Sequence, residues 1–219
     1  MTLPAYITFD CYDTLVEFPI DQVTSDLLGS RAHHVEREAF FRDFERIRYQ
    51  AILEPYRPYR EVLQQSLKRA MAKYGLAYRD EDGAGLVAAV STFGPWPEVP
   101  GVLDRLREHC KLVIISNTDD DIIAANVRNI GVPFDHVITA EQARAYKPSP
   151  VIFDYTLRTL QCTPADLVHV AQGFEYDIVP ASQLGWDRVW INRYGKTGNP
   201  AYQYRELPDL SGLPDLLGI

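Results

Sequence analysis

Residues 5–15 read Ala-Tyr-Ile-Thr-Phe-Asp-Cys-Tyr-Asp-Thr-Leu, and this stretch decides the fold. Residues 5–9 are β-branched and aromatic and end on the acid Asp10, a pattern typical of a buried strand. Three later apolar runs, each followed by polar residues, repeat this pattern at 112–115, 167–170 and 188–192. Near-continuous apolar strands predict a parallel sheet that is covered on both faces.

Helical patterns lie between these strands. We expect helices over residues 102–108, 122–130, 150–160 and 178–184. Thr118 or Asp119 is placed to cap the second of them, and Gly131 follows its end. Strands that alternate with helices of about ten residues predict an α/β fold with a Rossmann-like, doubly wound parallel sheet.

One long stretch interrupts the alternation. Residues 39–53 and 59–74 have the pattern of amphipathic helices, and the region between the first two strands contains no clear strand. Over seventy helical residues exceed what a simple crossover between strands needs. The sequence therefore predicts a Rossmann-like core of residues 1–17 and 94–219, with residues 18–93 inserted as a helical cap. Prolines 95, 97 and 100 mark the return to the core.

The composition limits the classes of function. Twenty-two basic and thirty acidic residues give a net charge of −8, which argues against nucleic acid or an anionic membrane surface as the partner. No apolar run approaches the roughly 20 residues that span a bilayer, and no signal peptide is evident. Three cysteines without CxxC spacing suggest neither disulfides nor a zinc site. We expect a cytoplasmic protein.

Four polar residues follow predicted strands and turns in a way that brings them together. They are Asp10, Ser116, Lys147 and Asp177. The carboxyl ends of parallel strands form the usual binding crevice of an open α/β sheet, so these side chains are expected to meet there.

The segments around these residues resemble the four motifs of the haloacid dehalogenase superfamily, in order and over essentially the whole chain. Phe9 to Leu15 is similar to the first motif, Ile114 to Asn117 to the second, Tyr146 to Pro150 to the third and Gln172 to Asp177 to the fourth. In that family the first aspartate is a covalent nucleophile, so the resemblance implies that Asp10 has this role.

Two departures indicate the branch. Phosphatases of the superfamily carry a second aspartate two residues after the nucleophile and a magnesium-binding aspartate at the start of the fourth motif; here Tyr12 and Gln172 stand at these positions. A hard dication needs several anionic oxygens. The pattern instead resembles the metal-independent L-2-haloacid dehalogenases. That resemblance implies no metal, no cofactor, a homodimer, and a small 2-haloacid converted to a 2-hydroxy acid with release of halide.

The chemistry assigns roles to these residues. Asp10 would form an ester, Lys147 would hold it ionised, and Thr14 would hydrogen-bond beside it. Asp177 would orient or activate the water that opens the ester. Ser116 and Asn117, at a helix start, would bind the substrate carboxylate.

The pocket walls and the halide site are expected from the resemblance. Arg42 is the best match to the cap arginine that takes the halide in related dehalogenases, and Arg46 is the second candidate. Further residues expected around the substrate are Tyr12, Tyr59, Gln172, Phe174 and Cys11, the last as a small buried side chain rather than a reactive thiol. The resemblance implies a tyrosine where Phe153 stands, and a serine and an asparagine where Gln172 and Phe174 stand.

Structural interpretations compete with these assignments. Asp10, Ser116, Asn117 and Asp177 are all residue types that cap helices, and Lys147 is of a type common in solvated loops. Two other functions also remain open: a phosphatase of small metabolites, which Tyr12 and Gln172 oppose, and a non-catalytic binding protein on the same scaffold.

Overall fold

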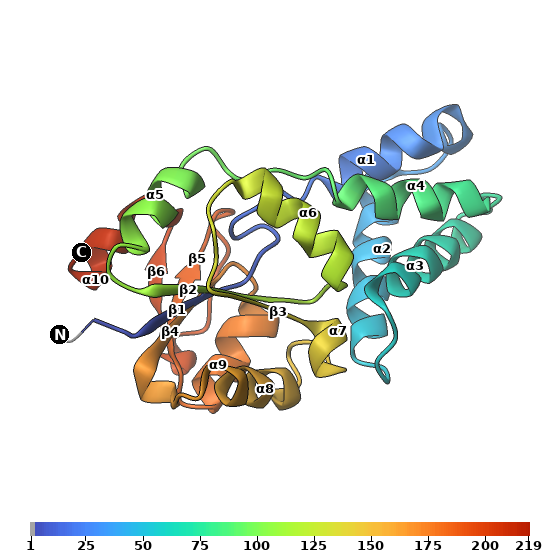
Figure 1. Cartoon of the computed structure of the whole chain (residues 1–219). Helices are drawn as coiled ribbons and strands as arrows, with labels where there is room; N and C mark the ends of the chain where they lie inside the picture. The colour runs from blue at the N-terminus through green and yellow to red at the C-terminus, as the bar shows by residue number, and fades with distance from the viewer. Residues whose placement is uncertain (1–2) are drawn as a thin grey trace.

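The computed structural model describes residues 3–219 and shows a three-layer α/β core with a group of four helices beside it (Figure 1). The central sheet has six parallel strands in the order β3-β2-β1-β4-β5-β6. The strands are β1 (Tyr6–Phe9), β2 (Lys111–Ser116), β3 (His136–Thr139), β4 (Leu167–Ala171), β5 (Asp187–Ile191) and β6 (Arg205–Leu207).

The predicted fold class is confirmed, and all four predicted strands are present, as β1, β2, β4 and β5. Strand β1 lies at the centre, with Tyr6 paired to Lys111 of β2 on one side and to Leu167 of β4 on the other. The sequence did not reveal β3 and β6. These strands are four and three residues long and only partly buried, so they lack the continuous apolar run that marks the others.

Helices cover both faces of the sheet (Figure 1). Helices α5, α6 and α10 lie on one face, and α7, α8 and α9 lie on the other. Asp119 precedes α6 and Gly131 ends it in a left-handed conformation, as expected from the sequence. The bounds are α5 (Val99–Leu106), α6 (Asp120–Ile130), α7 (Ala140–Ala143), α8 (Pro150–Leu160), α9 (Val179–Gln183) and α10 (Leu213–Leu217).

The helices of residues 18–93, the helical insertion, lie beyond the carboxyl ends of the strands in Figure 1. Helix α2 packs on α3, α3 on α4, and α4 on α1. The two predicted helices correspond to α2 and α3, whereas α1 and α4 were not individually foreseen. The bounds are α1 (Ile20–Leu28), α2 (Arg37–Ile52), α3 (Tyr59–Lys73) and α4 (Asp80–Val90). Within residues 3–219, none of the helices has the length and apolar character needed to cross a membrane.

The two connections between the insertion and the core run side by side. Val16 forms an isolated antiparallel bridge to Pro95. The Glu17 N–H donates to the Gly94 carbonyl and the Trp96 N–H to the Leu15 carbonyl, both at 3.0 Å. Residues 17 and 94 belong to these connections, and the division into a core and a cap at these positions stays a prediction.

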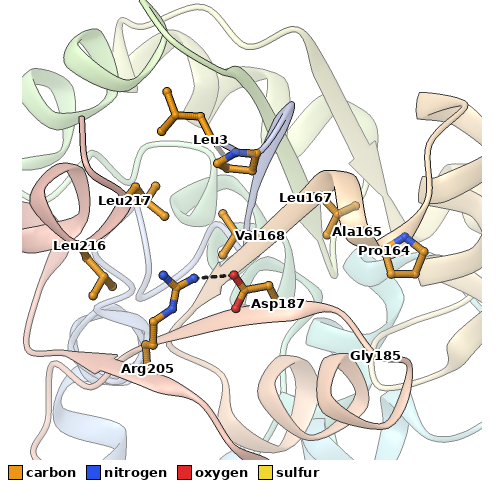
Figure 2. A pocket seen from close by; sticks show the side chains of 11 residues that line it. Leu3, Pro164, Ala165, Leu167, Val168, Gly185, Asp187, Arg205, Leu216 and Leu217 are labelled. Carbon is orange, nitrogen blue, oxygen red and sulfur yellow. Dashed lines mark hydrogen bonds and ion pairs between the residues drawn. The ribbon is translucent and has the colours of Figure 1, made fainter. Parts of the chain in front are cut away.

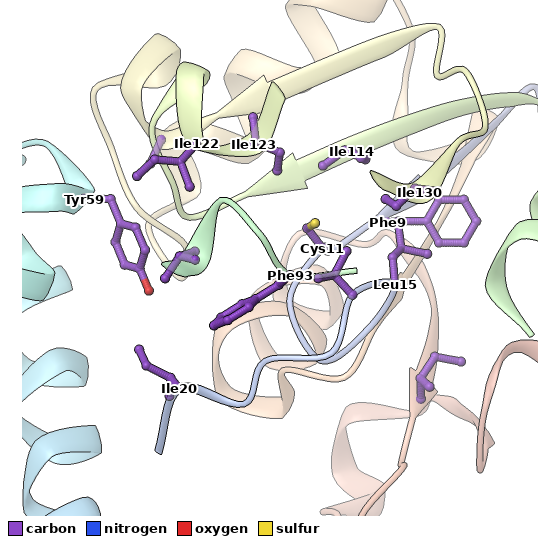
Figure 3. Packing of buried hydrophobic residues seen from close by; sticks show 14 of the residues in the cluster. Phe9, Cys11, Leu15, Ile20, Tyr59, Phe93, Ile114, Ile122, Ile123 and Ile130 are labelled. Atoms are coloured by element: carbon purple, nitrogen blue, oxygen red, sulfur yellow. The ribbon is translucent and has the colours of Figure 1, made fainter. Parts of the chain in front are cut away.

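An apolar cluster joins the sheet to the insertion. Figure 3 shows Phe9 and Ile114 of the sheet packed in the same cluster as Phe93 and Ile20, which lie at the two ends of the insertion. These residues are almost fully buried. Burial of apolar surface is the main favourable term in packing, so this cluster couples the insertion to the core.

A shallow depression lies at the opposite, amino end of the strands (Figure 2). Leu167 and Asp187, which begin β4 and β5, line it, and Asp187 forms an ion pair with Arg205 at 2.6 Å. This depression is separated by the length of the sheet from the residue Asp10 that follows β1.

Candidate active site

Asp10 follows β1 directly, and hydrogen bonds hold both of its carboxylate oxygens. Thr14 Oγ1 donates to Oδ2 at 2.8 Å, and Lys147 Nζ donates to Oδ1 at 2.8 Å. The Thr14 hydroxyl itself accepts from the N–H of Gln172 at 2.8 Å. The carboxylate of Asp10 is therefore held in one orientation at the carboxyl edge of the sheet.

Lys147 reaches this edge from the loop after α7 and is almost completely buried. Besides Asp10, its Nζ lies 2.7 Å from Asp177 Oδ1 and donates to the Ile115 carbonyl at 2.8 Å. The Asn117 side chain fixes the backbone of this loop, because it accepts from the Lys147 N–H at 2.7 Å and donates to the Lys147 carbonyl at 2.9 Å. All three protons of the ammonium group thus have acceptors.

Asp177 lies in a π-helical turn (Phe174–Ile178) after β4 and is also buried. Its Oδ1 accepts from Lys147 and lies 2.9 Å from His169 Nε2. His169 is in the middle of β4, and its Nδ1 lies 2.9 Å from Thr8 Oγ1. Two carboxylates, one lysine and one histidine therefore form a single buried network.

The charges of this network shift the pKa values of its members. Burial raises the pKa of Asp10 above its ordinary value, despite the opposing charge of Lys147. Burial also disfavours ionised Asp177, but the charge of Lys147 and the hydrogen bond from His169 outweigh it and lower the pKa of Asp177. Burial alone would lower the pKa of Lys147, yet the two carboxylates raise it.

Ser116 ends β2 and is completely buried. Its hydroxyl has no hydrogen-bond partner among the described residues, although a buried hydroxyl normally has one. The side chain of Asn117 binds the backbone of Lys147, and the expected binding of substrate by the backbone N–H groups of this segment stays a prediction. Of the two, Ser116 is the residue with an unused polar group.

The aromatic walls expected from the sequence connect the insertion to the core. Tyr12 donates its hydroxyl proton to Asn126 Oδ1 at 2.9 Å, and its ring packs on Phe18 at 4.9 Å. Tyr59 begins α3 and is 7% exposed, and its N–H donates to Asp119 Oδ1 at 2.6 Å. Cys11 is fully buried, which raises the pKa of its thiol well above the ordinary value, so it stays protonated.

The expectation that Arg42 or Arg46 takes the halide does not fit their positions in the structure. Arg42 lies on the exposed face of α2, and Arg46 is also exposed, paired with Asp43 at 2.9 Å. Arg48 instead lies on the buried face of the same helix.

The Arg48 guanidinium packs over the ring of Phe44 at 4.7 Å and that of Phe18 at 5.7 Å. Its Nε is buried without a hydrogen-bond partner, and Arg48 has no ion pair within the described part of the chain. The helical register could have revealed it, since Arg48 lies four residues after the buried Phe44.

Comparison with known proteins agrees with this geometry. The sequence matches the haloacid dehalogenase-like hydrolase family over residues 5–185. The chain belongs to this family. The resemblance of the four motifs is therefore confirmed, and so is the prediction of a hydrolase.

The chain is similar to several dehalogenases of this family. A haloacetate dehalogenase of Moraxella sp. is 36% identical over 104 residues, which is 46% of each chain. An (S)-2-haloacid dehalogenase of Pseudomonas sp. is 24% identical over 95% of this chain and 94% of its own. The solved structure of an L-2-haloacid dehalogenase from Xanthobacter autotrophicus, with chloropropionic acid covalently bound, has a TM-score of 0.82 at 21% identity and covers 99% of both chains.

The fourth motif of this family member differs from the expected pattern in its contacts. Gln172 contributes backbone groups, donating to Thr14 and accepting from Trp190 Nε1 at 2.9 Å. Phe174 packs on the Trp190 ring at 4.9 Å, in an aromatic cluster with Tyr202 and Tyr204. Its ring is partly buried against this cluster, and its expected place around the substrate stays a prediction.

Phe153 stands where the family resemblance implies a tyrosine. It is completely buried, and its ring packs at 6.1 Å from the His169 ring and 5.1 Å from the Trp186 ring. The contact from β4 to Asp177 is made by His169, which was not singled out from the sequence.

In residues 3–219, no cluster of three or more His, Cys, Asp or Glu side chains has the arrangement of a metal site.

Proposed function

We propose that this protein hydrolyses a small 2-haloalkanoic acid to the 2-hydroxy acid through an ester on Asp10. The observation that carries the proposal is the position of Lys147, whose Nζ lies 2.8 Å from Asp10 Oδ1 and 2.7 Å from Asp177 Oδ1. In addition, Tyr12 stands at the position where phosphatases of the superfamily have their second aspartate. The arrangement provides a nucleophile, a charge that keeps it ionised, and a second carboxylate for water.

In the first step, a carboxylate oxygen of Asp10 attacks the carbon that bears the halogen. A carbon–oxygen bond forms while the carbon–halogen bond breaks, and halide leaves with the bonding electrons. The raised pKa of Asp10 makes Lys147 essential here, since only the ionised carboxylate attacks. Thr14 and Lys147 hold the two oxygens, so the attacking group needs little reorientation.

Two unpaired polar groups suit the two anionic parts of the reaction. The buried Ser116 hydroxyl is available to donate to the substrate carboxylate. Arg48, which has aromatic contacts but no carboxylate partner in residues 3–219, is available to receive the departing halide. We assign to Arg48 the role first expected of Arg42. A cation among aromatic rings and little water interacts strongly with an anion.

In the second step, water attacks the carboxyl carbon of the Asp10 ester, and Asp177 takes one of its protons. The bond from that carbon to the substrate oxygen breaks, and this oxygen takes the proton from Asp177 and leaves as the hydroxyl of the product. Asp10 then releases the second proton of the water to solvent and returns to a carboxylate. The lowered pKa keeps Asp177 ionised at neutral pH, so its carboxylate has the free oxygen that this step needs.

A phosphatase is less well supported. Such an enzyme needs a proton donor close to the nucleophile, and Tyr12 commits its hydroxyl proton to Asn126. The positive charge between the two carboxylates is that of Lys147 itself. We therefore expect halide release that does not depend on magnesium and continues in the presence of a chelator.

A single turnover on 2-chloropropionate in heavy-oxygen water tests the proposal. The ester mechanism puts solvent oxygen into the Asp10 carboxylate and leaves the new hydroxyl of the product unlabelled. Asp10→Asn should lose turnover, whereas Asp13→Asn, a matched change three residues away, should keep the label at Asp10. Label found first in the product, or full activity that persists in Asp10→Asn without reversion to Asp, would refute the ester.

Assembly and location remain predictions. We propose a homodimer that buries apolar surface of the helical insertion, and a cytoplasmic location. Light scattering that shows only a monomer near 24.9 kDa would contradict the dimer. Fractionation of cells that express the protein tests its location.

A further inference from the structure

His169 is a polar residue in an otherwise apolar part of the core. It is completely buried, and its ring packs edge-on against Phe153 at 6.1 Å and Trp186 at 6.0 Å. Burying an imidazole in such surroundings is costly unless its nitrogens are hydrogen-bonded. The two reaction steps above do not use His169, so its presence needs another explanation.

Both ring nitrogens have partners. Nε2 faces Asp177 Oδ1 at 2.9 Å, and an ionised carboxylate only accepts, so Nε2 carries a proton. Nδ1 lies 2.9 Å from the hydroxyl oxygen of Thr8, which also donates to the Val168 carbonyl at 3.3 Å. The charged groups that face this ring are Asp177 and, through Asp177, Lys147. Thr8, His169 and Asp177 thus form a hydrogen-bonded chain.

This chain fixes which oxygen of Asp177 is free. Oδ1 receives both Lys147 and His169, whereas Oδ2 has no side-chain donor among the described residues. Oδ2 lies against Gly173, where a Cβ would come within 2.5 Å of it. The neighbouring Gln172 N–H binds Thr14, which holds Asp10. The free oxygen Oδ2 thus lies next to Gly173, one residue after Gln172, whose N–H binds Thr14.

We propose that His169 is a positioning residue for the second half of the reaction: its Nε2–H holds Asp177 Oδ1 so that Oδ2 accepts the proton of the attacking water. This inference rests on the proposed function. The first half of the reaction depends on Asp10 and Lys147, which contact each other directly, so it does not require His169.

A pair of variants of similar length separates this role from packing. His169→Gln keeps an N–H near the position of Nε2, whereas His169→Met fills similar space and offers no donor. With saturating 2-chloropropionate, rapid quench measures the burst of halide, and intact-protein mass spectrometry measures the fraction of enzyme carrying the ester. In His169→Met we expect a burst rate within about threefold of wild type and steady-state turnover lower by about 10²-fold, the scale of one general base.

The ester should therefore accumulate in His169→Met, and His169→Gln should restore most of the turnover and remove the accumulation. If burst and steady state fall together, or if the Gln and Met variants behave alike, the positioning role is wrong while the dehalogenase proposal stands. A wild-type protein that releases no halide from any 2-haloacid overturns both. Should His169→Met fail to unfold cooperatively, His169→Leu, which suits the apolar walls of Phe153 and Trp186, makes the same comparison.

Discussion

Replacing Lys147 by Met removes a buried charge while keeping an unbranched side chain of similar length. The lost ammonium group lies 2.8 Å from Asp10 Oδ1, 2.7 Å from Asp177 Oδ1 and 2.8 Å from the Ile115 carbonyl. Removing one partner of a buried ion pair costs about 3–5 kcal/mol, because the other charge is left uncompensated. We expect a loss of this size in the free energy of unfolding near pH 8, or roughly 6–20 °C in Tm at ~2–4 °C per kcal/mol.

The loss should depend on pH in a defined direction. In the wild type, the lowered pKa of Asp177 contributes stability that is present above the ordinary aspartate pKa and is lost as the pH falls through the lowered value. In Lys147→Met, Asp10 and Asp177 lie close together without a cation, so at least one pKa rises above its unfolded value. The folded variant then binds more protons than its unfolded chain, and its stability falls as the pH rises. The deficit against wild type therefore grows from about pH 5 to about pH 8.

Urea unfolding followed by tryptophan fluorescence at these pH values measures the effect. Adding Asp177→Asn to Lys147→Met removes the second carboxylate charge and should recover part of the lost stability. A deficit below about 1 kcal/mol, or one that is equal at acid and alkaline pH, would show that the carboxylates do not depend on Lys147 and would refute the reasoning.

Three further results are expected. Arg48→Ala should lower kcat/KM for 2-chloropropionate by about 10²–10³-fold, the scale of one lost stabilising donor, whereas Arg42→Ala on the exposed face should change it less than about threefold. Gly173→Ala places a Cβ 2.5 Å from Asp177 Oδ2 and should cost about 1–3 kcal/mol in urea unfolding and slow release of product. Burial raises the pKa of Asp13 to about 6, so wild-type stability falls as the pH rises from about 4 to 6; Asp13→Asn should gain up to about 3 kcal/mol on wild type over that range.

The strands that the sequence predicted are those with the most buried residues. Strands β1, β2, β4 and β5 were recognisable because each contains at least three consecutive buried residues, most of them apolar. Strand β6 consists of Arg, Glu and Leu at the edge of the sheet, where one side needs no apolar cover. Its pairing with β5 is a tertiary contact, and no local pattern in three residues reports it.

The sequence predicted the site residues that lie at the ends of strands or in the turns after strands and helices. It did not predict Arg48 and His169, which lie within a helix and a strand. Asp10, Lys147 and Asp177 come together as expected, and their roles in catalysis remain predictions. Arg48, to which we assign the halide role, was not chosen from the sequence, because the arginines of α2 look alike until the buried face of the helix is known. His169 gave no signal, because a single histidine in an apolar strand has no spacing that reveals partners as distant as Thr8 and Asp177.

The central place of β1 also determines the order in which the protein can assemble. Tyr6 can pair with Lys111 and Leu167 only after both have been synthesised. The second of these partners lies 161 residues after Tyr6 in the chain. At about 5–20 residues per second, ribosomes need roughly 8–32 s to make that stretch. The helical insertion has mainly local contacts, α2 with α3 and α3 with α4, and such contacts form early. During synthesis we therefore expect the helices to fold first, whereas Asp10 acquires its lysine and its second carboxylate only when residues 147 and 177 have emerged.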